Sequence, residues 1–280
     1  MDSRALASKA DSLRALHVPG QPLLLVNAWD AASAVIVARA GAKAIATSSS
    51  AAANAAGRPD GQRLTRGAML AAVAQIAAAV DLPVTADMEA GYGDTAEDAA
   101  ATAQGVIGAG AVGFNLEDTS SAGSADDPLL PTEQFVAKIV AIRAVATESG
   151  VPLVLNARTD IFLAGVGDPS TRLERALARG RAYLDAGADC FFVPGVADPD
   201  QIAALVERSG GPVSVLAMPG SPSLTELAAL GVARVSVGSG LYRAALALAQ
   251  QIAREVYDEG TLATMVGKQV EFTEAQALFS

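Results

Sequence analysis

The chain has 280 residues, 51% of them hydrophobic, 4% aromatic and 18% charged, with a net charge of −10 at pH 7. This length supports one large core, which must be built mainly from Ala, Val, Leu and Ile because aromatic residues are scarce. The acidic balance excludes nucleic acid and anionic membrane surfaces as partners, since no basic patch offsets the long-range repulsion.

Cysteine usage and hydropathy indicate a cytoplasmic protein. The single cysteine, Cys190, excludes an internal disulfide and a zinc site of several thiolates, and we expect it to be a small buried residue. No apolar run reaches the roughly 18 to 20 residues of a membrane-spanning helix without an interrupting charge, Gly or Pro. The first residues also lack the apolar stretch of a signal peptide.

In chain order, a helix is predicted over residues 3–16, and short apolar runs then alternate with helical segments. Four runs begin at proline and four follow glycine, which are residues that suit a strand start and the cap of the preceding helix. The eight predicted strands begin near Pro22, Ala44, Pro83, Val112, Pro152, Cys190, Pro212 and Val235.

Eight Ala-rich segments with helical spacing follow these strands, at 31–40, 65–79, 95–108, 132–148, 170–186, 198–208, 223–230 and 239–257. Short apolar strands that alternate eight times with helices predict an α/β fold, a closed (β/α)8 TIM barrel. An open, doubly wound sheet is the alternative. We expect one domain over 1–280, with the N-terminal helix, the barrel at 22–258 and extra C-terminal helices at 261–280. These helices would pack on the barrel or on a neighbouring subunit.

Polar side chains follow each of the first five predicted strands. In a (β/α)8 barrel the active site lies at the carboxyl ends of the strands, so these side chains should share one rim. The later strands place fewer polar groups there, so the predicted site lies toward the first half of the barrel. The rim residues are Asn27, Trp29 and Asp30, then Ser48–Ser50, Asp87 and Glu89, Glu117 and Arg158.

The stretch Pro83–Asp94 contains the central pair of this rim, Asp87 and Glu89, followed by glycines that allow a sharp turn. These carboxylates, with Asp60 and Glu117, would repel one another if they converged without a cation. Since no thiolate or second histidine is near, the sequence predicts a hard cation, Mg²⁺ or alternatively Mn²⁺. One carboxylate would bind it directly while the others hold its waters. The alternative is that Asp87 caps a helix and Glu89 is solvated.

Two other polar features allow more than one interpretation. Arg158 either forms an ion pair that only holds the acids in place or neutralises an anionic substrate. Ser48–Ser50, before a run of small residues, either present donors to a carboxylate or form a plain loop. The only histidine, His17, lies before the first strand, and we expect a structural or solvated role for it.

Several ordered motifs resemble the isocitrate lyase and phosphoenolpyruvate mutase superfamily across essentially the whole chain. They are Asn27–Ala34, Ser48–Ser50, Gly57–Gly61, Ala86–Gly93, Leu116–Asp118 and Asn156–Asp160. The resemblance implies a magnesium-dependent enzyme acting on 2-oxo acids or their relatives, which cleaves or forms a C–C or P–C bond next to an enolate. It also implies a homo-oligomer, a dimer or tetramer, with C-terminal helices exchanged between subunits as one arrangement.

Carried over by position, the resemblance makes Asp87 the principal metal ligand, Ser48 and Ser49 the carboxylate site, and Arg158 the partner of the leaving or migrating group. The candidate metal residues are Asp87, Glu89, Glu117 and Asp60, and the candidate catalytic residues are Arg158, Glu117 and Asp60. The candidate substrate-binding residues are Trp29, Asp30, Ser48, Ser49, Ser50, Gly91, Tyr92 and Arg158.

The loop Thr119–Pro128 departs from the pattern of this superfamily. Its lyases resemble one another in a Lys-Lys/Arg-Cys-Gly-His motif there, and this loop has no Cys, Lys or His, so a succinate-forming lyase is not expected. The mutase and phosphonopyruvate hydrolase branch has Lys and Asn, whereas this loop has Asp126 and Asp127. Each close charge pair would repel a phosphonate dianion by about 1 kcal/mol, unless the two carboxylates are simply solvated.

Three functions stay open. The leading one is a Mg²⁺-dependent enzyme that cleaves a C–C bond of a small 2-oxo acid through an enolate, as an oxaloacetate-type decarboxylase or hydrolase. The second is a P–C bond enzyme: a phosphoenolpyruvate or carboxyvinyl-carboxyphosphonate phosphonomutase, or a phosphonopyruvate hydrolase. The third is a 2-oxo-acid-binding protein without turnover.

Overall fold

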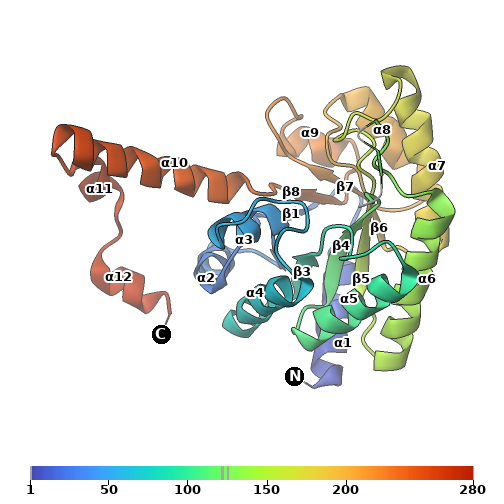
Figure 1. The fold of residues 1–280 in the computed structure, drawn as a ribbon, viewed down its shortest axis with the longest axis horizontal. Coiled ribbons are helices and arrows are strands. Elements are labelled where there is room, and N and C mark those ends of the chain that lie inside the picture. Colours follow the sequence, from blue (N-terminus) through green and yellow to red (C-terminus); the bar gives the residue numbers. More distant parts are fainter. Residues whose placement is uncertain (1, 121–122, 125, 280) are drawn as a thin grey trace.

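The computed structural model describes residues 2–120, 123–124 and 126–279, so part of the 119–128 loop lies outside the described residues. Eight parallel strands form a barrel surrounded by helices (Figure 1), with the strand order β1-β8-β7-β6-β5-β4-β3-β2. The strands are β1 Leu23–Leu25, β2 Ile45–Ala46, β3 Val84–Asp87, β4 Gly113–Glu117, β5 Val154–Arg158, β6 Cys190–Phe192, β7 Val213–Leu216 and β8 Arg234–Ser236.

The seam between β1 and β2 joins only at their carboxyl ends. There Ala28 N donates to Ala46 O at 2.8 Å and Ser48 N donates to Ala28 O at 3.1 Å. The barrel is therefore nearly closed, and the predicted (β/α)8 fold is confirmed. These two hydrogen bonds lie at the rim that carries the polar residues.

The helices also follow the predicted order, with one addition. They are α1 Ser3–Ala15, α2 Ala31–Arg39, α3 Ser49–Ala55, α4 Arg66–Ala79, α5 Ala96–Gly108, α6 Thr132–Ser149, the 3-10 turn Pro169–Thr171, α7 Arg172–Asp185, α8 Pro199–Arg208, α9 Leu224–Ala229, α10 Gly240–Arg254, the π turn Glu255–Glu259, α11 Ala263–Lys268 and α12 Phe272–Ala277. The addition is α3, because Ser48 Oγ accepts the Ala51 N–H at 3.3 Å and caps a run of alanines that favours helix.

Except for Leu24 of β1, the strand residues are buried or half-buried, and the core contains the residues expected to be structural. Cys190 is fully buried, as predicted. His17 is 8% exposed, its Nδ1 lies 2.8 Å from Leu13 O, and its Nε2 lies 3.5 Å from the buried Arg234 Nη1. Of the structural and solvated roles considered for His17, the structure shows the structural one. Among the described residues, no helix has both the length and the apolarity that crossing a bilayer requires.

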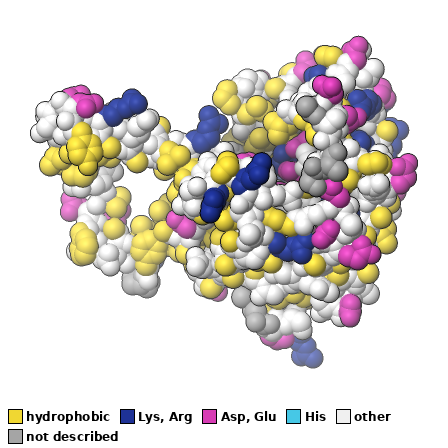
Figure 2. Space-filling model, in the orientation of Figure 1, with side chains coloured by type: hydrophobic (Ala, Val, Ile, Leu, Met, Phe, Trp, Pro, Cys, Tyr) yellow, Lys and Arg dark blue, Asp and Glu magenta, His cyan; other side chains and the backbone are white. Residues whose placement is uncertain are grey.

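The C-terminal helices form an arm. Figure 1 shows α10 extending away from the barrel, with α11 and α12 beyond it. Among α10 residues only Tyr242 is buried, while Leu246 is 48% exposed. Figure 2 shows apolar side chains exposed along this arm. The chain end returns to the barrel, where Leu278 and Phe279 line a cavity of about 390 Å³ with residues of α2 and α4.

Candidate active site

Asp87, the last residue of β3, presents two different oxygens at the rim. Its Oδ2 accepts hydrogen bonds from Ser49 N at 3.0 Å and Ser49 Oγ at 2.8 Å. Its Oδ1 is buried and has no hydrogen-bond partner among the described residues. A buried carboxylate oxygen without a donor is costly, and a bound cation would satisfy it.

Glu89 lies in a strained turn immediately after β3. Glu89 and Tyr92 have φ values of 50° and 61°, in the left-handed region that non-glycine residues seldom adopt. The Glu89 Oε2 accepts the Gln62 N–H at 2.5 Å, and Tyr92 OH lies 3.4 Å from Oε1. The turn therefore fixes where the second carboxylate of the predicted pair is placed.

Three side chains from neighbouring helices hold the backbone of this turn. Lys138 of α6 donates from Nζ to Ala90 O at 2.5 Å and to Gly93 O at 2.8 Å. Thr102 Oγ1 donates to Gly91 O at 2.7 Å, and Arg66 Nη2 donates to Tyr92 O at 2.9 Å. Burial lowers the pKa of Lys138 to about 8. Sequence analysis missed these residues, because they lie inside helices far from the rim motifs.

Arg158, at the end of β5, is held by two carboxylates. Its Nη1 lies 3.0 Å from Glu117 Oε2, and its Nε and Nη2 lie 2.5 and 2.8 Å from the two oxygens of Asp160. Burial would lower the pKa of Arg158, but Glu117 and Asp160 raise it above its usual value. The ion-pair role considered for Arg158 is thus present in the structure, whereas its contact with an anionic substrate stays a prediction.

Asp118 anchors this arrangement from behind the rim. It is fully buried, its Oδ1 accepts the Asp160 N–H at 3.0 Å, and its Oδ2 accepts from Tyr183 OH at 2.7 Å and Arg179 Nη1 at 3.0 Å. These bonds connect β4 and the end of β5 to α7. Asp118 therefore orients Asp160, which in turn orients Arg158.

Three carboxyl groups of the rim have pKa values above their usual range, and a bound cation would lower these values. Burial raises the pKa of Glu89 to about 7 and that of Glu117 to about 8, and nearby Asp87 adds to both shifts. Burial, with a contribution from Asp87, also raises the pKa of Asp60, whose Oδ1 lies 3.5 Å from Ser49 Oγ. A divalent charge would favour the ionised forms.

The acids do not form a complete set of direct ligands. Within the described part of the chain, no three Asp, Glu, His or Cys side chains come close enough together to hold an ion by themselves. Mg²⁺ usually keeps several waters and takes one or two carboxylates, so a site built on Asp87, with water between the cation and the other acids, fits these residues. The metal assignments of Asp87, Glu89, Glu117 and Asp60 stay predictions.

Two cavities open at the rim, and the predicted residues divide between them. A cavity of about 200 Å³ is lined by Ser48, Ser49, Ser50, Asp60, Asp87 and Arg158, among others. A second cavity, of about 480 Å³, is lined by Glu89 and Glu117 with Gly61, Gln62, Arg63, Thr119 and Ser120. Asp87 and Arg158 therefore share one cavity, and Glu89 and Glu117 contact the other.

Four predicted substrate-binding residues line neither cavity. Trp29 packs edge-on against Tyr242, with ring centroids 5.1 Å apart, and Asp30 caps α2 by accepting the Ser33 N–H at 2.7 Å. Gly91 and Tyr92 belong to the turn held by Lys138 and Arg66. These four residues have structural contacts within the chain, and their substrate contacts stay predictions.

By its fold and its rim, the protein belongs to the class of (β/α)8 barrels that have an acidic, arginine-containing site at the carboxyl ends of β3 to β5. The family model described as phosphoenolpyruvate phosphomutase matches residues 13–257. The chain therefore belongs to the phosphoenolpyruvate phosphomutase family, within the isocitrate lyase and phosphoenolpyruvate mutase superfamily that its motifs predict.

Individual proteins are similar to this chain over nearly its whole length. The uncharacterized protein Rv1998c of Mycobacterium tuberculosis is 40% identical over 267 residues, 95% of each chain. A structure from Burkholderia cenocepacia J2315, described only as a lyase/mutase, is 40% identical with a TM-score of 0.90, covering 99% of this chain and 97% of that one. A phosphonopyruvate hydrolase in complex with oxalate and Mg²⁺ is 26% identical with a TM-score of 0.83, covering 96% and 94%.

Proposed function

We propose that the chain is a Mg²⁺-dependent enzyme, with Mn²⁺ as the alternative cation, that cleaves a C–C bond of a small 2-oxo acid through an enolate. The reaction is of the oxaloacetate decarboxylase or hydrolase type. The observation that carries this proposal is the buried, unpartnered Oδ1 of Asp87, in a cavity that Asp60 and Arg158 also line. A divalent cation held there by Asp87 would polarise the substrate's keto oxygen as a Lewis acid. Asp60, Glu89 and Glu117 would hold its waters.

The three serines have two different roles in this proposal. Both donors of Ser49 are bound to Asp87 Oδ2, so Ser49 orients the metal ligand. Ser48 and Ser50 line the same cavity, and we assign the substrate's C1 carboxylate to their hydroxyls. Together these contacts fix the keto end of the substrate against Asp87.

Arg158 faces the reacting end. In decarboxylation the C3–C4 bond of oxaloacetate breaks, CO₂ leaves, and the electron pair passes into the enolate. Water then protonates C3 to give pyruvate. The guanidinium of Arg158, fixed by Glu117 and Asp160, would hold the C4 carboxylate before it leaves.

The test is pyruvate formation from oxaloacetate with Mg²⁺, measured above the background of the metal alone. We expect activity that excess EDTA removes and that Asp87→Ala abolishes. Asp185→Ala, which removes an exposed carboxylate at the end of α7, is the matched control and should keep full activity. Full activity of Asp87→Ala would contradict the assignment.

A P–C bond enzyme is the second candidate. It is supported by the matching family model and by the likeness to a phosphonopyruvate hydrolase. Release of inorganic phosphate from phosphonopyruvate, or its conversion to phosphoenolpyruvate, would favour this candidate over decarboxylation. Tight binding of 2-oxo acids without turnover on either substrate would favour a binding protein.

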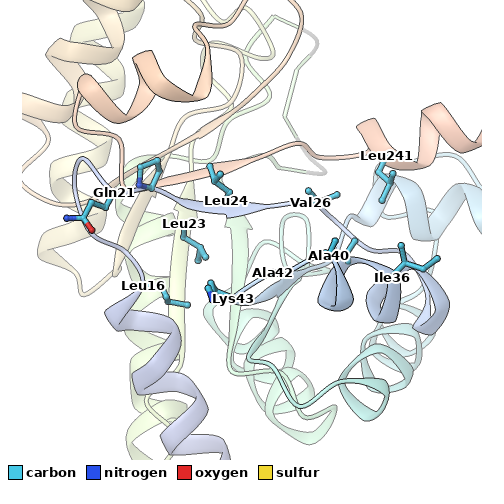
Figure 3. A pocket seen from close by; sticks show the side chains of 13 residues that line it. Leu16, Gln21, Leu23, Leu24, Val26, Ile36, Ala40, Ala42, Lys43 and Leu241 are labelled. Atoms are coloured by element: carbon cyan, nitrogen blue, oxygen red, sulfur yellow. The ribbon is translucent and has the colours of Figure 1, made fainter. Parts of the chain in front are cut away.

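We also propose that two copies of the chain exchange their α10 helices. The eighth helix of a (β/α)8 barrel normally packs on the barrel's outer face, but here α10 leaves it. A mostly apolar groove of about 630 Å³ lies there. Figure 3 shows its lining, which comes from β1, α2 and the segments next to them, with Leu241 of α10 and with Gln21 and Lys43 as the polar members. Within it Leu24 is 47% exposed and Ile36 is 50% exposed. The apolar α10 of a second copy matches this groove in chemistry and in place.

Light scattering after gel filtration tests the exchange. We expect a dimer, or a tetramer built from such dimers, and dissociation by Ile36→Asp because a charge would enter the groove. Val140→Asp is the matched control, since Val140 is 54% exposed on α6 and lies outside the groove. A monomeric wild-type protein would contradict the exchange.

A further inference from the structure

The 200 Å³ cavity has two chemically different sides. Ser48 follows β2 and Asp87 ends β3, whereas Phe192 ends β6 and Leu216 ends β7. In the strand order, β6 lies four places from β2 and β7 lies four places from β3. In an eight-stranded barrel these strands are across from each other. The apolar residues therefore face the side that would hold the metal and the substrate's C1 carboxylate.

Four residues form this apolar wall: Leu163, Phe192, Pro194 and Leu216. Phe192 and Pro194 are buried, and the Phe192 ring centroid lies 5.8 Å from Arg158 Cζ. Leu163, in the loop after β5, is 46% exposed and lines the same cavity. An apolar group of a ligand placed against these four side chains would remove their exposed apolar surface from water.

The cavity disfavours a substrate with a further anionic group beyond the one that Arg158 would bind. Within the described residues, Arg158 is the only cationic side chain that lines this cavity, and Glu117 and Asp160 already hold it. An anionic group beyond Arg158 would meet the apolar wall without a counter-charge and would lose its hydration. The wall therefore suits a small alkyl group beside the carbon that Arg158 faces.

We propose that the substrate is a 2-oxo acid with an alkyl substituent on C3, and that Leu163, Phe192, Pro194 and Leu216 bind this substituent. The inference rests on the function proposed above. In this arrangement the C1 carboxylate and the keto group lie on the Asp87 side, a C4 carboxylate contacts Arg158, and the C3 alkyl group contacts the wall. Oxaloacetates alkylated at C3 meet these three requirements.

Ligands without a C4 carboxylate test the wall separately from turnover. Calorimetry with Mg²⁺ would compare pyruvate, 2-oxobutanoate and 3-methyl-2-oxobutanoate, which add one carbon at C3 at each step. We expect affinity to rise about fourfold with each added carbon, because each carbon buries apolar surface. Leu216→Asn, of similar size but polar, should flatten this series, whereas Leu216→Met should preserve it. A Mg²⁺ titration and circular dichroism would verify that both variants are folded.

Kinetics with 3-methyloxaloacetate and oxaloacetate complete the test. We expect the wild-type kcat/KM to favour the methylated substrate, and Leu216→Asn to remove that preference. Turnover of oxaloacetate with a flat ligand series would overturn the alkyl inference and leave the proposed function standing. If no 2-oxo acid binds or reacts in the presence of Mg²⁺, both fail together.

Discussion

The rim at the carboxyl ends of β2 to β5 and the arm of α10 to α12 differ in whether their side chains have partners within the chain. At the rim, Asp87 Oδ2 and the guanidinium of Arg158 have partners within the chain. On the arm, Tyr257 is 88% exposed and Phe272 is 76% exposed. The chain itself fixes the geometry of the rim, whereas the arm leaves apolar side chains exposed, which fits the proposed exchange of α10 between two copies. Substitutions at the rim should therefore change metal and substrate binding, and those on the arm should change assembly.

Among residues that support the rim without binding the metal, the largest effect on this contrast is expected from Lys138→Met. Without the ammonium, the carbonyls of Ala90 and Gly93 lose their donor and the turn that places Glu89 relaxes. We expect Mg²⁺ affinity to fall about 10- to 100-fold, the range for residues that orient metal ligands. Lys268→Met, at an exposed position on the arm, should leave Mg²⁺ affinity unchanged. Equal metal affinity in both variants would remove Lys138 from the site.

Gly91→Ala tests the same turn by adding one carbon. Gly91 has a φ of 87°, and a Cβ there would lie 2.8 Å from Leu116 Cδ1. We expect a loss of about 2 kcal/mol in the free energy of unfolding, measured with urea, since strain and overlap both act. Gly267→Ala is the control on the arm, where an added Cβ meets nothing within 4 Å and φ is not in the positive range. An equal loss in both variants would break the contrast between the two regions.

His17 gives the barrel core a pH dependence between about pH 6.5 and pH 4. Burial lowers the pKa of His17 from 6.5 to about 4, with a contribution from Arg234. The unfolded chain therefore binds this proton more readily, so stability is complete above pH 6.5 and falls as the pH is lowered toward 4. Because other groups titrate equally in both proteins, we expect the stability of wild type relative to His17→Leu to fall by about 2 kcal/mol between pH 7 and pH 5. Parallel stability curves for the two proteins would contradict this origin.

The smallest effect is expected from Tyr92→Phe. The hydroxyl of Tyr92 lies 3.4 Å from Glu89 Oε1, at the long end of hydrogen-bond distances. We expect less than about a threefold change in Mg²⁺ affinity and in kcat, because the bond is weak and the ring stays in place. Calorimetry and steady-state kinetics would measure both. A tenfold loss would give the Tyr92 hydroxyl a direct role in the reaction.

Sequence patterns predicted most of the fold because proline and glycine mark every strand start. The eight strands and their order around the barrel follow from that repeat. The α3 helix escaped prediction because the serines before it resemble a loop, and their capping role depends on the geometry after β2. The departure of α10 from the barrel also has no sequence signal, since its apolar spacing is that of any packed helix.

Sequence patterns indicated which side chains lie together at the strand ends, but they gave no sign of which side chains have local roles, and the functional roles of all these residues stay predictions. Ser49, Asp60, Asp87 and Arg158 line one cavity, as their positions after β2 to β5 indicate. Asp30, by contrast, is used by its own helix. One sequence feature could have identified Lys138. It lies on the same buried face of α6 as Phe135, Ile139 and Ile142, and a charged residue is rarely buried without a partner.

Mg²⁺ binding to wild type and Asp87→Asn, measured by calorimetry with oxalate present, tests the central claim most directly. The substitution keeps the size of the side chain and removes its charge, and Asp185→Asn serves as the control. We predict saturable Mg²⁺ binding to wild type and to the control, and a loss of at least about 100-fold in Asp87→Asn, because a direct ligand should matter no less than the residues that orient it. Equal Mg²⁺ affinity in all three proteins would contradict a metal site at Asp87.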